Sequence, residues 1–118
     1  MTRAADLVFD LRHAAALEGA AVVGEAVGGE RLVVRIGLWL DAGRVIRARF
    51  RATTCPALLA YAEAACALAE ARGDLAGIDE AALRREVEGV HPLHRGRAAL
   101  VADALRAAAV RARGGAAP

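Results

Sequence analysis

The sequence contains no serine, lysine, asparagine or glutamine, and all 16 of its basic residues are arginine. These absences exclude a serine nucleophile, a P-loop lysine and a Schiff-base lysine. Aromatic residues make up only 3% of the chain, so it offers no stacking platform for single-stranded nucleic acid. No hydrophobic run has the length needed to cross a membrane. We therefore expect neither a nucleic-acid partner nor a membrane partner.

Only two cysteines are present, and the first residues do not resemble a signal peptide. These features predict free thiols and a cytoplasmic location. The formal charge of +2 is too small to argue for DNA or RNA binding. A length of 118 residues suits one hydrophobic core. We expect a single domain over residues 1–113 and a disordered tail over residues 114–118.

Hydrophobic periodicity predicts helices and strands in the order α-β-β-β-α-α-α. The expected elements are a helix over residues 4–18, strands over residues 20–27, 32–40 and 44–52, and helices over residues 56–71, 79–88 and 95–113. Consecutive strands followed by consecutive helices are typical of α+β proteins. We therefore expect a three-stranded antiparallel sheet covered by helices.

Alternating residues assign faces to the two longer strands. The face predicted to be buried carries Leu32, Val34, Ile36, Leu38, Leu40, Ile46, Ala48, Phe50 and Ala52. The opposite face of the second strand carries Arg47, Arg49 and Arg51. Because antiparallel sheets often expose one face to water, these arginines are predicted to be solvated. The alternative is a surface for an acidic partner.

Cys55 stands between the end of a strand and the start of a helix, and Pro56 suits the first helical position. At a helix N-cap the thiolate is favoured over the thiol, and the thiolate binds metals and attacks electrophiles. The alternative is a small buried hydrophobic residue. Cys66 lies eleven residues further along the same helix, about 16 Å away at 1.5 Å per residue. It is therefore predicted to be a core residue that shares neither an ion nor a disulfide with Cys55.

Three other polar residues are predicted to be solvated. His13 follows Arg12 in the first expected helix and is interpreted as a surface residue. Glu63 and Glu70 lie seven residues apart on one helix face. They are interpreted as solvated carboxylates rather than a catalytic pair.

The stretch over residues 29–50, the following Cys55, the Val-His-Pro-Leu-His run at residues 90–94 and residues 100–105 occur in an order that resembles a known family. The family is the IscU/NifU N-terminal type of iron–sulfur cluster assembly scaffold. Its site uses three cysteines and one aspartate. This chain resembles a divergent member that lacks two of the three cysteines.

The resemblance implies a site made of residues that are distant in the sequence. Gly29, or Gly28, stands at the first cysteine position, Glu30 at the aspartate, Cys55 at the second cysteine and Arg97 at the third. Glu30, Cys55 and either His91 or His94 would form a mixed ligand set for Zn²⁺ or Fe²⁺ rather than a cluster. Arg97 would stabilise the Cys55 thiolate.

The function implied by the resemblance is that of a non-enzymatic scaffold. It would bind iron, an iron–sulfur cluster, zinc or sulfur, with a cysteine desulfurase, other assembly proteins or an Hsp70-type chaperone as partners. The alternative is a protein-binding module that keeps the fold without the metal. Such a module would use the face that carries Arg47, Arg49 and Arg51, or the loop that contains Pro92.

Overall fold

The computed structural model describes residues 2–115. Residues 116–118 of the predicted tail lie outside the described residues, while residues 114 and 115 continue the last helix. In chain order the elements are β1 (Thr2–Arg3), α1 (Ala4–Phe9), β2 (Val22–Val27), β3 (Val33–Asp41), β4 (Arg44–Ala52), α2 (Pro56–Arg72), α3 (Glu80–Glu86), β5 (Val87–Glu88), the 3₁₀ helix η1 (Pro92–His94) and α4 (Arg97–Gly115). None of the described helices is both long enough and apolar enough to cross a membrane.

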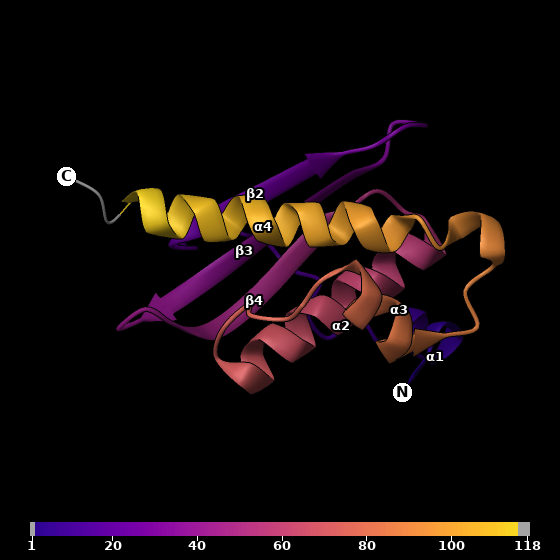
Figure 1. Ribbon diagram of the computed structural model, residues 1–118, viewed down its shortest axis with the longest axis horizontal. Helices are drawn as coiled ribbons and strands as arrows, with labels where there is room; N and C mark the ends of the chain where they lie inside the picture. The colour runs from indigo at the N-terminus through magenta and orange to yellow at the C-terminus, as the bar shows by residue number, and fades with distance from the viewer. Residues whose placement is uncertain (1, 116–118) are drawn as a thin grey trace.

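The main sheet is antiparallel, with strand order β2-β3-β4. Helices α2 and α4 pack on the sheet, α4 against β2 and α2 against β4 (Figure 1). Two short strands, β1 and β5, pair in parallel beside the helices. The predicted α+β architecture, a three-stranded antiparallel sheet with helices packed on it, is confirmed. The predicted order of elements is incomplete, because it lacks β1 and β5, and residues 87 and 88, which were predicted to end a helix, form β5.

The core lies between the sheet and the two long helices. Leu32, Val34, Ile36 and Leu38 are buried there, as their alternation predicts. Gly24, which pairs with Ile36, lies directly under α4. A Cβ at Gly24 would lie 2.1 Å from the carbonyl oxygen of Ala104 and 2.4 Å from the amide nitrogen of Ala108. The absence of a side chain at this one position therefore sets how closely α4 approaches β2.

Helix α2 is rich in alanine and is the most enclosed helix of the fold. It contacts β4, α1, α3 and α4. Cys55 occupies its N-cap position and Pro56 its first turn, as predicted. Gly73 ends the helix with a φ of 75°, a left-handed conformation that favours glycine.

The prediction of one helix over residues 4–18 is wrong, because α1 ends at Phe9. Residues 10–21, which we call the strap, follow an irregular path along β4 instead. The Phe50 N–H donates to the His13 carbonyl oxygen (2.9 Å), and the Ala15 N–H donates to the Phe50 carbonyl oxygen (3.2 Å). Leu17 of the strap packs against Gly37 on the face of the sheet opposite the core. Partners on β4 thus replace the helical hydrogen bonds that the local pattern favours.

The predicted inward direction of Ile46 is also wrong, because 62% of its surface is exposed. A β-bulge shifts the pairing between β3 and β4 at Trp39 and Leu40, so Val45 is buried instead. One extra residue on a strand reverses the direction of the side chains beyond it. The turn between the strands is as expected, with positive φ at Ala42 (52°) and Gly43 (81°).

Candidate functional site

A groove of about 460 Å³ lies between the β2–β3 turn and the start of α4. We call it the sheet-end groove. Its lining residues are Val27, Gly28, Gly29, Glu30, Leu32, Gly96, Arg97, Ala99, Leu100 and Asp103. Three of the predicted site residues, Gly29, Glu30 and Arg97, therefore lie together.

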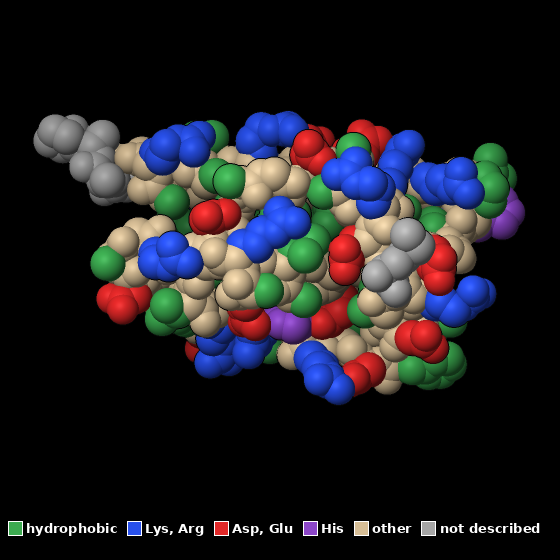
Figure 2. All heavy atoms as spheres, turned by 60° about the horizontal axis from the view of Figure 1, so that its bottom comes forward, with side chains coloured by type: hydrophobic (Ala, Val, Ile, Leu, Met, Phe, Trp, Pro, Cys, Tyr) green, Lys and Arg blue, Asp and Glu red, His purple; other side chains and the backbone are tan. Residues whose placement is uncertain are grey.

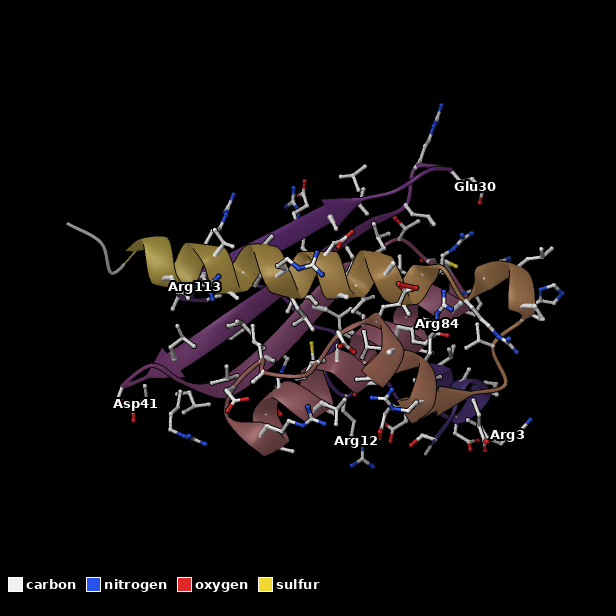
Figure 3. The ribbon with its side chains drawn as sticks, in the orientation of Figure 1. Arg3, Arg12, Glu30, Asp41, Arg84 and Arg113 are labelled. Atoms are coloured by element: carbon white, nitrogen blue, oxygen red, sulfur yellow. The ribbon has the colours of Figure 1, made fainter. Side chains whose placement is uncertain are left out.

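The turn that carries Glu30 has a defined backbone geometry. The Leu32 N–H donates to the Gly29 carbonyl oxygen (3.2 Å), and the two central residues, Glu30 and Arg31, have φ of 60° and 61°. Glu30 lies at this end of the molecule in Figure 3, near the start of α4. Its Oε2 accepts a hydrogen bond from the guanidinium of Arg97 (3.2 Å). The carboxylate predicted to bind a metal is therefore paired with an arginine.

Cys55 and His94 are not lining residues of the sheet-end groove. The Cys55 side chain is half-buried against the core, and it makes no capping hydrogen bond to α2. His94 is exposed in η1, where its ring centroid lies 5.5 Å from that of His91. The His94 imidazole, which the family resemblance places in one ligand set with Glu30, therefore lines a different groove.

Within residues 2–115, no group of three or more His, Cys, Asp or Glu side chains could hold a metal ion. An iron–sulfur cluster needs thiolate ligands, usually four, and a structural zinc site needs four ligands. The predicted donors are one thiol, a carboxylate bound to Arg97, and an imidazole in a separate groove. These residues do not fit a cluster or a zinc ion.

A second groove, of about 300 Å³, contains His94. We call it the α1 groove, since α1 forms one wall and the start of α2 and the segment before α4 form the others. Its lining residues are Ala4, Ala5, Val8, Phe9, Pro56, Ala57, Gly89, Val90, His91 and His94. Phe9 is 91% exposed, and Leu93 of η1 is 80% exposed. Figure 2 shows hydrophobic side chains at the surface at the right-hand end of the molecule, where Figure 1 places α1 and the segment before α4.

The predicted arginine face is not one continuous surface. Arg47 lies over the ring of Trp39, 5.1 Å from its centroid. Arg49 points to Glu70 of α2, with its Nη1 2.5 Å from Oε2, and Arg51 is exposed. The prediction of three solvated arginines is therefore wrong for Arg49.

Four charged or titratable side chains meet in a cluster that the sequence interpretation missed: His13, Arg49, Glu63 and Glu70. The two oxygens of Glu63 contact the His13 backbone N–H (2.9 Å) and the ring Nδ1. The ring Nε2 lies 2.9 Å from Oε1 of Glu70. Glu63 is only 3% exposed, so the interpretation of His13 and Glu63 as solvated residues is wrong. We call this group the His13 cluster.

The His13 cluster shifts the pKa of one of its own members, Glu70, and of the neighbouring Cys66 thiol. Burial raises the pKa of Glu70, but hydrogen bonds from the Ala48 amide, His13 and Arg49 outweigh it, and the net pKa is lowered. Burial raises the pKa of the Cys66 thiol, and the two glutamates raise it further. Cys66 is thus a neutral, fully buried core residue, as predicted. The spacing of Glu63 and Glu70 on either side of Cys66, within the alanine-rich part of α2, is the signal for a buried polar cluster.

A further groove, of about 550 Å³, lies near the other end of α4. Its charged lining residues are Asp74 and Arg113, and the remainder are apolar or glycine. Arg113 is far from Glu30 in Figure 3. No titratable cluster or predicted site residue belongs to it.

Comparison of the sequence with protein-family models finds no match, and comparison with curated proteins finds none.

Proposed function

We propose that this protein is a non-enzymatic, cytoplasmic protein-binding module of the IscU/NifU-like fold. It binds an apolar segment of another protein in the α1 groove. Through the family resemblance, the proposed partners are iron–sulfur assembly proteins such as a cysteine desulfurase. The protein retains the fold and the partner interaction of the family without its metal site.

The observation that supports this function is an apolar groove whose lining includes a large and exposed hydrophobic side chain. Phe9 lines the groove, and Leu93 lies in the segment between His91 and His94, which also line it. Exposed hydrophobic groups that gather around a groove are typical of protein-interaction sites, whereas isolated ones are common on any surface. The loop that contains Pro92 also belongs to the run at residues 90–94 that carries part of the family resemblance.

The electrostatics of the sheet-end groove favour this function over metal binding. The Arg97 guanidinium supplies a positive charge where a cation would have to bind. The half-buried Cys55 thiol contributes a single soft ligand at most. Cys55 directly precedes Pro56, which lines the α1 groove. It does not line the sheet-end groove, where Glu30 lies.

The test is to select peptides from a random displayed library against the full chain and to measure their affinity by fluorescence polarisation. The variants are Phe9→Ala and Leu93→Ala, with Val110→Ala as the matched control. Val110 is an exposed hydrophobic residue of α4 (54%) that does not line the α1 groove. Because all three residues are exposed, none of the substitutions removes core packing.

We expect Phe9→Ala and Leu93→Ala to weaken binding about tenfold each, which is the effect of truncating an interface anchor residue, and Val110→Ala to leave it unchanged. Equal affinity for all four proteins would contradict binding at this groove. Anaerobic incubation of wild type and Cys55→Ala with Fe²⁺ and sulfide tests the metal alternative. An absorbance band that depends on Cys55 would overturn the proposal.

A further inference from the structure

The two ring nitrogens of His13 both face carboxylate oxygens. Nδ1 contacts Glu63, and Nε2 lies 2.9 Å from Glu70. An ionised carboxylate only accepts hydrogen bonds, and a neutral imidazole carries only one N–H. While both carboxylates are ionised, both contacts can therefore be hydrogen bonds at the same time only when the ring carries two protons. We propose that protonated His13 clamps the strap to α2 and β4, and that loss of the ring proton releases the strap.

The charges in the cluster balance only in the clamped state. Glu63 and Glu70 from α2 supply two negative charges, and Arg49 from β4 and the protonated His13 ring supply two positive ones. The buried Cys66 thiol of α2 also lies near the two glutamates and Arg49, and it is neutral.

Arg49 cannot replace the histidine, because its ion pair is with Glu70 and not with Glu63. After deprotonation, the buried carboxylate of Glu63 keeps the His13 backbone N–H as its donor but has no charged partner. A buried charge without a partner is strongly unfavourable. Release of the strap admits water to Glu63 and removes this cost.

The part of the strap around His13 has one backbone pairing with β4, at Phe50, through the carbonyl of His13 and the N–H of Ala15. Leu11 packs against the core, and Leu17 covers Gly37 further along. The far end of the strap stays attached to β3, where the Ala21 N–H donates to the Leu38 carbonyl oxygen (2.8 Å). His13 thus accepts the Phe50 hydrogen bond through its backbone carbonyl and also carries the titrating ring. The ring proton therefore controls the pairing of the strap with β4 directly.

Release also changes the α1 groove, because the strap begins at Asp10, directly after Phe9. Three further α1 residues, Ala4, Ala5 and Val8, line that groove. Loss of the His13 proton removes the anchor that follows α1, and binding at the α1 groove should weaken. This consequence rests on the proposed function, whereas the clamp itself does not.

The clamp is tested by NMR on the full chain, from about pH 5 to pH 9, the range in which imidazole titrates. Ring ¹⁵N shifts report the protons on His13, and hydrogen exchange reports the protection of the Ala15 and Phe50 amides. The Thr53 amide, which donates to Val33 within the sheet (2.9 Å), is the internal control. We expect the protection of Ala15 and Phe50, relative to Thr53, to fall about tenfold or more as the ring loses its second proton.

Two variants separate the ring from general effects of pH. His13→Gln should abolish the pH-dependent step, while Arg12→Gln should retain it, because Arg12 pairs only with the exposed Asp10. The clamp is overturned if the ring is neutral throughout, or if it loses its proton without a change in the relative protection. The titration of the wild type gives this answer even if His13→Gln fails to fold.

The groove is tested separately with a selected peptide, whose affinity is measured over the same pH range. We expect binding to weaken as the Ala15 and Phe50 amides lose protection. If no peptide binds the α1 groove, the proposed function fails and the NMR result on the clamp still stands. If a peptide binds the groove with an affinity that does not follow the clamp, the coupling between them is refuted.

Discussion

Replacing Gly24 by alanine is predicted to separate α4 from the sheet. The new Cβ would lie 2.1 Å from the Ala104 carbonyl oxygen and 2.9 Å from the Ala108 Cα. Non-bonded carbon atoms prefer separations of about 3.5–4.0 Å, so helix and strand must move apart by more than about 1 Å. A gap of that size forfeits a quarter to a half of the dispersion energy of each contact. Since the obstructing atoms are backbone, no side-chain rotation relieves the clash.

We expect Gly24→Ala to lower the free energy of unfolding by about 3 kcal/mol or more, at the upper end of the range for overpacked cores. Urea unfolding, followed by far-UV circular dichroism and by the fluorescence of Trp39, the single tryptophan, measures this change. Gly29→Ala is the matched control, because a Cβ at Gly29 meets nothing within 4 Å. It should change the free energy of unfolding by less than about 1 kcal/mol. If the two variants were equally stable, the close approach of α4 to β2 would not be a constraint on this fold.

Three further predictions concern other parts of the chain. Ala42→Asn should raise the free energy of unfolding by about 1 kcal/mol in the same urea assay, because Asn tolerates the positive φ of this turn better than Ala. Glu70→Gln should lower it by about 2 kcal/mol near neutral pH, since bonds to a charged group are lost. Because the pKa of Glu70 is lowered in the folded protein, its stabilisation is complete above the pKa of an unfolded glutamate, about 4.3. This stabilisation is lost as the pH falls through the lower pKa of the folded protein. The difference in free energy of unfolding between wild type and Glu70→Gln should therefore decrease in acid. A difference that does not change with pH would refute the lowered pKa of Glu70. Iodoacetamide should modify Cys55 and spare Cys66 in the native protein, because Cys66 is fully buried and its thiol pKa is raised; mass spectrometry would show two adducts if this is wrong.

The main elements of the fold could be predicted from the sequence because local patterns and tertiary packing agree for them. The alternation from Leu32 to Leu38, the turn at Ala42 and the start of α2 at Pro56 each carry their own signal. The first helix could not be delimited this way. Residues 10–18 favour a helix locally, but pairing with Phe50 and burial of His13 against α2 override that preference.

Only part of the candidate site could be predicted from the sequence, namely the residues whose secondary-structure elements end or begin at the same end of the molecule. Residues 28–30 and Arg97 meet because the β2–β3 turn and the start of α4 lie at the same end of the molecule. The direction of Arg49 was not predictable, since strand alternation gives the face of a side chain but not its partner on α2. The His13 cluster depends on contacts fifty or more residues apart, which a single sequence does not encode as a local pattern.

The enclosure of α2 has a consequence for how this protein tolerates mutation. Ala60, Ala62, Ala65 and Ala69 are completely buried, so different sides of one helix are in contact with neighbouring elements. A larger residue at any of these positions would displace a neighbouring layer, whichever direction its side chain took. Natural variation should therefore accumulate on α1, η1 and the exposed side of α4, where new binding specificities can arise, while α2 stays close to its present small-residue composition.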